Sequence, residues 1–191
     1  MPPIAYVATV VSNPLHVLLI SGSTRANSTN TSALRTVAAD APEGIEVTLY
    51  DGLLELPAFV PGDEAEPPIV EALHKQINNA DAVLICTPEY AGMIPGSLKN
   101  LLEWTVGTGD LSDKPVAWIN VAYEGRGEEA IATLRTVLGY VGADLVESAS
   151  GRITVVREAI GEDGLVSDPN IRADLTAALT ALANHTRYGK Y

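Results

Sequence analysis

The chain has 191 residues, which is the length of a single domain with a substantial core. Hydrophobic residues make up 47% of the sequence and charged residues 19%, and no apolar run approaches the ~20 residues that a membrane-spanning helix needs. The formal net charge of −12 repels a phosphate backbone. We therefore expect one domain over residues 1–191 with its core at about 15–185, no membrane span and no nucleic-acid partner.

The N-terminus and the cysteine content indicate the compartment. The first 17 residues lack a basic region, and Pro14 interrupts their apolar stretch, so we expect no export signal. Cys86 is the only cysteine in the sequence, which excludes an internal disulfide and a paired thiolate site for a metal. These observations predict a cytoplasmic protein without a metal site.

Apolar runs alternate with segments of helical periodicity along the chain. The runs predict strands, in order, at 16–22, 45–51, 81–88 and 114–122, and a fifth strand in either 144–149 or 151–156. The periodic segments predict helices around 34–38, around 69–77, from Pro95 or Gly96, over 131–141, and from Asp168 with Pro169 in the first turn.

Strands that are apolar throughout and are joined by helices predict an α/β fold with a parallel sheet. A doubly wound, five-stranded sheet with helices on both faces follows, because each crossover helix covers one side. Ligands of such sheets bind beyond the carboxyl ends of the strands. The loops expected to form a site are therefore 22–31, 51–68, 87–96 and 121–128.

The loop 22–30, GSTRANSTN, is rich in hydroxyl and amide groups and carries one cation, Arg25. It precedes a predicted helix, whose N-terminus offers unpaired N–H groups and the positive end of the dipole. The loop lacks the Gly and Lys of a P-loop and the three glycines of the dinucleotide fingerprint, so a terminal monophosphate suits it better than a pyrophosphate. The expected contacts are Ser23, Arg25, Ser28, Thr29 and Asn30. The alternative is a polar turn in which Ser28 or Asn30 only caps the helix.

The second informative loop is TPEYAGMIPGSLKNLLEW, residues 87–104. Together the two loops resemble the NADPH-dependent FMN reductase family, a flavodoxin-like group that includes quinone, chromate and azo-dye reductases. Its signatures are G-S-x-R-x-x-S-x-N and P-E-Y-N-x-x-x-P-G-x-L-K-N-x-x-D-W. The matching residues are Gly22, Ser23, Arg25, Ser28 and Asn30 in the first, and Pro88, Glu89, Tyr90, Pro95, Gly96, Leu98, Lys99, Asn100 and Trp104 in the second. Ala91 and Glu103 stand where the family usually has asparagine and aspartate.

The resemblance implies a flavodoxin-like fold in which the first loop holds the phosphate of FMN. It also implies that the isoalloxazine is lined, partly through backbone groups, by Pro88, Glu89, Tyr90, Ala91, Gly92, Met93 and Ile94. The flavin itself carries the electrons, so no side chain is assigned as catalytic, and backbone N–H groups near Ala91 and Gly92 are the candidate contacts to the ring. The resemblance further implies that NADPH or NADH is the electron donor and that a quinone, free flavin, azo compound or metal oxyanion is the acceptor. It also implies a homodimer or homotetramer.

Two other functions remain open from the sequence. One is an electron carrier of the flavodoxin kind, and the other is a non-catalytic module that binds a nucleotide or phosphate monoester. Cys86 lies in an apolar strand and is expected to be inert. The three histidines, His16, His74 and His185, show neither a triad nor metal-ligand spacing. Arg126 is expected to be solvated, with contact to a nicotinamide dinucleotide phosphate as the alternative.

Two segments predict an interface between subunits. Residues 51–68 form a Pro-rich acidic connection whose apolar side chains need a cover: Leu53, Leu54, Leu56 and Phe59. The third helix presents a wide apolar stripe, expected to serve the core on one side and a two-fold interface on the other: Leu98, Leu101, Leu102 and Trp104. Lys99 and Asn100 on that helix are expected to be structural.

Overall fold

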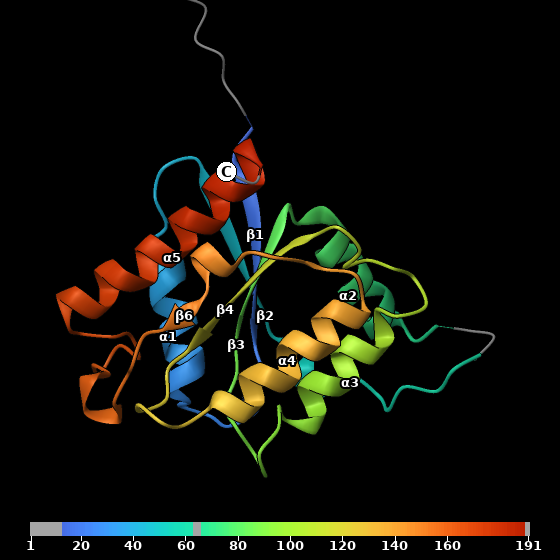
Figure 1. The fold of residues 1–191 in the computed structure, drawn as a ribbon, viewed down its shortest axis with the longest axis horizontal. Coiled ribbons are helices and arrows are strands. Elements are labelled where there is room, and N and C mark those ends of the chain that lie inside the picture. Colours follow the sequence, from blue (N-terminus) through green and yellow to red (C-terminus); the bar gives the residue numbers. More distant parts are fainter. Residues whose placement is uncertain (1–12, 63–65, 190–191) are drawn as a thin grey trace, which may run out of the picture.

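A computed structural model describes residues 13–62 and 66–189, and in it a parallel sheet carries helices on both faces (Figure 1). The strands are β1 (Leu15–Ser21), β2 (Ile45–Tyr50), β3 (Ala82–Cys86), β4 (Pro115–Asn120), β5 (Asp144–Leu145) and β6 (Gly151–Arg152). They lie in the order β2-β1-β3-β4-β5, β6 also pairs with β4, and all these pairings are parallel. This is the order of the flavodoxin-like doubly wound fold, and it confirms the predicted fold class.

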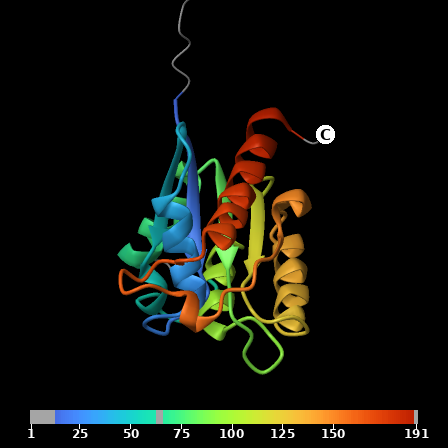
Figure 2. The same ribbon diagram turned by 90° about the vertical axis from the view of Figure 1, so that its left-hand side faces the viewer.

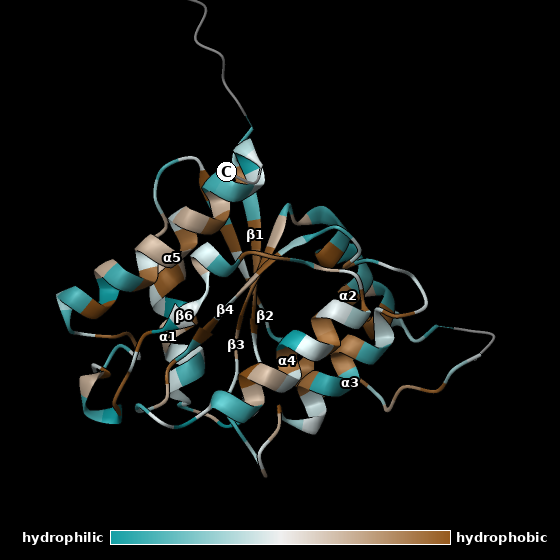
Figure 3. Cartoon of the chain, in the orientation of Figure 1, coloured by the Kyte–Doolittle hydropathy of each residue, from teal (hydrophilic) through white to brown (hydrophobic). Residues whose placement is uncertain are grey.

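The helices divide between the two faces of the sheet (Figures 1 and 2). One apolar cluster lies beneath α1 (Thr29–Ala39) and α5 (Pro169–Tyr188). The other lies beneath α2 (Pro68–Asn79), α3 (Gly96–Trp104) and α4 (Glu128–Tyr140). Figure 3 shows hydrophobic residues along the strands that both clusters share. The all-apolar runs of the sequence are therefore strands that are buried from both sides.

Two helix starts agree with the sequence prediction. Helix α3 begins at Gly96 with Pro95 at the cap position. Helix α5 is capped by Asp168, whose carboxylate accepts hydrogen bonds from the N–H groups of Asn170 and Ile171. In the part of the chain that the structure describes, no helix is long and apolar enough to cross a membrane.

The fifth strand of the prediction is divided in two. Both candidate segments pair with β4, as β5 and β6, and a short 3₁₀ turn, η2 (Glu147–Ala149), separates them. The hydroxyl of Ser150 accepts a hydrogen bond from the N–H of Trp118 at 3.1 Å and donates to the carbonyl of Val146 at 2.9 Å. This side chain takes a place that backbone groups fill in an unbroken ladder.

The segment after β2 packs against its own chain. The ring of Phe59 packs edge-on against Trp104, with the ring centroids 5.0 Å apart. The amide of Asn100 accepts from the N–H of Phe59 and donates to the carbonyl of Pro57, in both cases at 2.8 Å. Leu53 is buried, and Leu56 packs against the core. Leu53, Leu56 and Phe59 therefore have cover within the chain, contrary to the prediction for these three side chains, whereas Leu54 is 74% exposed. Residues 63–65 of this loop, like the first 12 residues, lie outside the described part of the chain.

The apolar stripe of α3 also lies inside the monomer. Leu98, Leu101 and Leu102 are 0% exposed, and Trp104 is 7% exposed. The indole N–H of Trp104 donates to the carbonyl of Pro57 at 3.0 Å. The helix is thus covered by the sheet on one side and by the 57–59 segment on another, which accounts for the width of its stripe. The predicted two-fold interface on these residues was wrong.

Candidate functional site

A cavity of about 510 Å³ opens where the carboxyl ends of β1, β3 and β4 meet, at the lower edge of the sheet in Figure 1. Three of the four expected loops form it, and residues 51–68 do not. The residues that line it are Ser23, Arg25, Ser28, Thr29, Asn30, Thr87, Pro88, Glu89, Tyr90, Asn120, Val121, Ala122, Tyr123, Arg126 and Gly127. All five residues predicted for the first loop are among them.

Gly22 sets the distance between the first two loops. Its N–H donates to the carbonyl of Cys86 at 2.8 Å. A Cβ at this position would lie 2.2 Å from the Oγ1 of Thr87 and 2.9 Å from the Cδ2 of Leu98. Only a glycine therefore allows the β1–α1 loop to approach β3 and α3 this closely.

Ser28 and Asn30 are tied to the local structure. Ser28 is the N-cap of α1, and its hydroxyl accepts from the backbone N–H of Asn30 at 3.2 Å. The amide oxygen of Asn30 accepts from the thiol of Cys86 at 3.3 Å, which links the helix start to β3. Ser28 thus performs the capping role that the sequence left open, and both residues also line the cavity. Burial raises the pKa of the Cys86 thiol, as expected for an inert cysteine.

The cavity has an excess of positive charge in an acidic protein. Arg25 and Arg126 line it from different loops, and within the described residues neither side chain is paired with a carboxylate. Glu89 is the acidic residue of the lining, and its Oε2 accepts from the backbone N–H groups of Glu129 and Ala130, each at 3.2 Å. This carboxylate is thus bound at the positive end of α4. The arrangement suits an anionic ligand.

The second loop makes a tight turn at residues 90–93. Tyr90 and Met93 exchange backbone hydrogen bonds of 2.9 and 3.1 Å. Ala91 has φ of 51° and Gly92 has φ of 74°, which are the left-handed conformations of a type I′ turn. Asparagine adopts this conformation more readily than alanine, which explains the family preference at position 91. Pro88, Glu89 and Tyr90 line the cavity, whereas Ala91, Gly92 and Met93 are exposed outside it and Ile94 lies in the core.

Ala91→Asn is therefore expected to stabilise the protein. The change relieves part of the left-handed strain, and we expect the free energy of unfolding to rise by about 0.5–1 kcal/mol. Urea denaturation measures it, with Ala26→Asn as the control, because Ala26 is an exposed loop alanine outside the positive-φ positions. An unchanged or lowered stability for Ala91→Asn alone contradicts the strain argument.

Asn120 organises the third loop, and the sequence analysis missed it. Its side chain is almost fully buried, accepts from the N–H of Ala122 at 3.0 Å and donates to the carbonyl of Arg126 at 3.2 Å. Gly127, with φ of 79°, lies so close that a Cβ there would be 2.7 Å from the Oδ1 of Asn120. In the sequence, the glycines indicate that this loop is compact. An asparagine at the end of a strand is common and gives no sign that it holds the loop.

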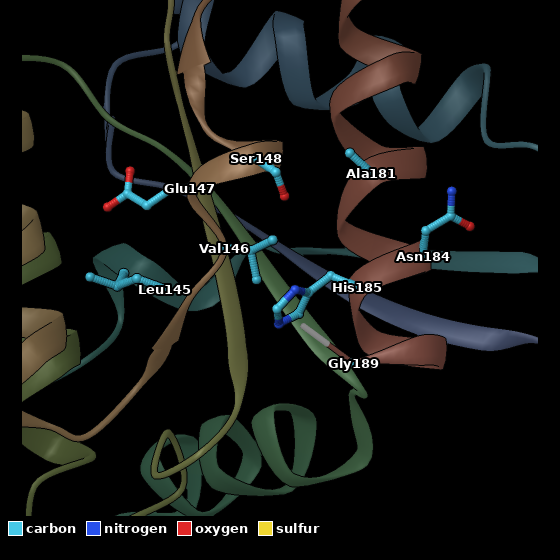
Figure 4. Close-up of a pocket in the computed structure, with 8 residues that line it drawn as sticks. All are labelled: Leu145, Val146, Glu147, Ser148, Ala181, Asn184, His185 and Gly189. Carbon is cyan, nitrogen blue, oxygen red and sulfur yellow. The ribbon is translucent and has the colours of Figure 1, made fainter. Parts of the chain in front are cut away.

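The remaining candidates lie elsewhere. The histidines pair with other side chains away from the cavity: His16 with Thr48, His74 with Asp110 and His185 with Asp144. Residues 13–62 and 66–189 contain no cluster of His, Cys, Asp or Glu suited to a metal. A second cavity, of about 480 Å³, lies between α5 and the β5–η2 segment (Figure 4). Its lining includes His185 and Glu147 but none of the predicted site residues.

Comparison with known proteins agrees with this geometry. The model of the family described as NADPH-dependent FMN reductase matches residues 15–152. A quinone reductase of Escherichia coli K12 is 33% identical over 179 residues, which cover 90% of this chain and 95% of that protein. An NAD(P)H-dependent FMN reductase of Pseudomonas aeruginosa is 32% identical over 178 residues, with 90% and 95% covered.

A solved structure gives the same result. The flavoenzyme NAD(P)H:(acceptor) oxidoreductase of Paracoccus denitrificans superposes with a TM-score of 0.75 at 27% identity, covering 90% of this chain and 98% of that one. These matches confirm the predicted oxidoreductase function with FMN as cofactor and a nicotinamide nucleotide as donor. The chain belongs to the NADPH-dependent FMN reductase family.

Proposed function

We propose that FMN binds in the cavity at the strand ends, and that the enzyme uses it to pass reducing equivalents from NADPH or NADH to a small acceptor such as a quinone. The phosphate lies at the first loop, against Ser23, Arg25, Thr29 and the start of α1. The ring lies between residues 88–90 and the 121–127 loop. The observation that carries this proposal is the position of Arg25, which pairs with no carboxylate of the described residues, beside the hydroxyl-rich start of α1.

The residues present fit FMN. The first loop supplies a cation, hydroxyls and the free N–H groups of a helix whose first turn contains no acidic residue. Gly22 allows the first loop to approach β3. Gly127 allows the third loop to pack directly against the side chain of Asn120. The absence of a P-loop or dinucleotide fingerprint favours one phosphate over two.

The side chains of this cavity would bind and orient the flavin and the substrates, and the flavin would supply the hydride-accepting and electron-donating chemistry. Glu89 fixes the second loop on the first turn of α4. Tyr90 is 51% exposed and Tyr123 is 63% exposed, and both line the cavity. Their aromatic faces are suited to the planar ring of a quinone or a nicotinamide.

Steady-state kinetics test this function. The FMN-loaded protein is expected to oxidise NADPH or NADH over many turnovers when benzoquinone is present. An electron carrier of the flavodoxin kind would hold FMN but oxidise the nucleotide slowly, and a non-catalytic module would bind no flavin. The quinone reductase relative favours the first outcome.

A homodimer or homotetramer in the cytoplasm is part of the same proposal. Val106, just after α3, is 62% exposed, and Tyr140, the last residue of α4, is 90% exposed. The two helices are neighbours, so these apolar side chains could contribute to one interface. The lone thiol of Cys86 suits a reducing compartment.

Tyr140→Glu is expected to weaken that assembly, since it places a charge in an apolar contact. Light scattering across a dilution series measures the mass. Tyr188→Glu is the control, because Tyr188 is 65% exposed at the end of α5, on the other face of the sheet. A wild-type monomer at every concentration contradicts the proposed assembly.

A further inference from the structure

Arg152, on the edge strand β6, contacts the third loop of the cavity through most of its guanidinium. One nitrogen, Nη1, donates to the carbonyls of Ala122 and Tyr123 at 2.7 and 2.6 Å. The other, Nη2, donates to the carbonyl of Arg126 at 2.9 Å and also to the carboxylate of Glu128. Three carbonyl oxygens of one short loop thus accept from a single cation, whose side chain is 23% exposed.

Neutral groups hold the same loop as well. Gly125 and Gly127 have φ of 74° and 79°, so both positions use the conformational freedom of glycine. Asn120 donates to the carbonyl of Arg126 from the strand end, Thr154 donates to the carbonyl of Ala122 at 3.2 Å, and the N–H of Arg126 donates to the carbonyl of Tyr123 at 3.0 Å. Arg152 differs from these donors in that it is charged and joins all three carbonyls to β6 at once.

The same arginine connects the third loop with the second. Its carboxylate partner, Glu128, is the first residue of α4. The next two residues of that helix donate their N–H groups to Glu89, in the loop after β3. The first turn of α4 therefore joins the two loops between which the flavin ring is placed.

We infer that Arg152 is a positioning residue for the isoalloxazine: it holds the carbonyl oxygens of residues 122, 123 and 126 on its guanidinium and fixes the wall that faces the ring. The inference rests on the proposed flavin site. Without the guanidinium, each of these carbonyls loses its charged donor, so the wall is held only by the remaining neutral hydrogen bonds and its position varies more.

Because the wall faces the ring and not the phosphate, the effect does not depend on the phosphate. Loss of Arg152 lowers the affinity for FMN and for riboflavin by the same factor. Loss of Arg25 lowers the affinity for FMN alone. The two arginines are thus separable by one pair of ligands.

Arg172 provides a matched control. It also joins two carboxylate oxygens and a carbonyl, donating to Asp40 at 2.8 and 2.5 Å and to Val166 at 2.9 Å. It links α5 to α1, has a similarly shielded side chain at 30% exposure, and does not line the flavin cavity. Replacing it tests what the loss of an arginine bridge does to the fold alone.

The experiment compares R152M, R152K and R172M with the wild type. Flavin-free protein is titrated with FMN and with riboflavin, followed by the quenching of flavin fluorescence, and the thermal midpoint is measured for each. We expect R152M to lower the affinity for both ligands at least tenfold and by the same factor. R152K is expected to lower both affinities at least threefold, since one ammonium cannot reproduce the several hydrogen bonds of the planar guanidinium. R172M leaves both affinities within twofold even where its midpoint falls.

Unchanged affinities in folded R152M overturn the inference, as does a loss confined to FMN or an equal loss in R172M. If R152M does not fold, R152K decides, and affinities within twofold of the wild type overturn the inference in that case. A wild type that binds neither flavin overturns the proposed function itself, whereas normal wild-type binding with insensitive Arg152 variants overturns the positioning role alone.

Discussion

Gly22→Ala is expected to lower the free energy of unfolding by about 1–3 kcal/mol and to weaken FMN binding at least tenfold. The added Cβ would lie 2.2 and 2.7 Å from the Oγ1 and Cβ of Thr87. Thr87 is buried, so one loop must move away from the other. Chemical denaturation and flavin titration measure the two effects.

The control for this change is Gly96→Ala, because a Cβ at Gly96 meets nothing within 4 Å. Adding Thr87→Gly to Gly22→Ala removes the two contacts with Thr87 and leaves the one with the Cδ2 of Leu98, so the two changes together are expected to recover part of the affinity in a double-mutant cycle. If Gly22→Ala behaves like Gly96→Ala, close approach of the two loops does not shape the site.

Arg25→Ala is expected to lower the affinity for FMN by one to two decades and to leave the affinity for riboflavin unchanged. The side chain offers a charge-assisted hydrogen bond to the phosphate, worth about 1.5–3 kcal/mol, and riboflavin has no phosphate. Arg35→Ala is the control, because Arg35 lies on α1 close to the loop and does not line the cavity. Equal weakening of both flavins by Arg25→Ala assigns the residue a structural role.

Ser23→Ala is expected to act in the same direction with a smaller effect. Ser28→Ala is a poor test of phosphate binding, because Ser28 also caps α1 and its loss costs about 1 kcal/mol of stability. The structure thus separates two serines that the loop sequence presents as equivalent.

The main strands and the starts of α3 and α5 could be predicted because their signals are local. A run of buried apolar residues such as β1, or Asp168 before Pro169, is determined by its immediate neighbours. The edge strand was ambiguous because β5 and β6 have two residues each, too few to show a period. Their pairing depends on β4 and on the hydroxyl of Ser150.

The loops that form the site could be predicted, but the long-range hydrogen bonds that hold them in place could not. The first loop can be recognised from its many hydroxyl and amide side chains, and its five predicted residues line the cavity. The bond from Glu89 to α4 spans 40 and 41 residues, and those from Arg152 to the third loop span 26 to 30. No local pattern reports such contacts. The wide stripe of α3 was misread for the same reason, since its cover comes from Pro57 and Phe59, more than 40 residues earlier.

Equilibrium titration of the flavin-free protein with FMN and with FAD tests the central claim most directly, because the claim is a single flavin site built for one terminal phosphate at the carboxyl ends of the strands. We expect one FMN bound per chain and weaker binding of FAD, since the first loop lacks the glycines that a pyrophosphate requires. Binding of FAD as tight as that of FMN, or no saturable binding of FMN, would contradict the account.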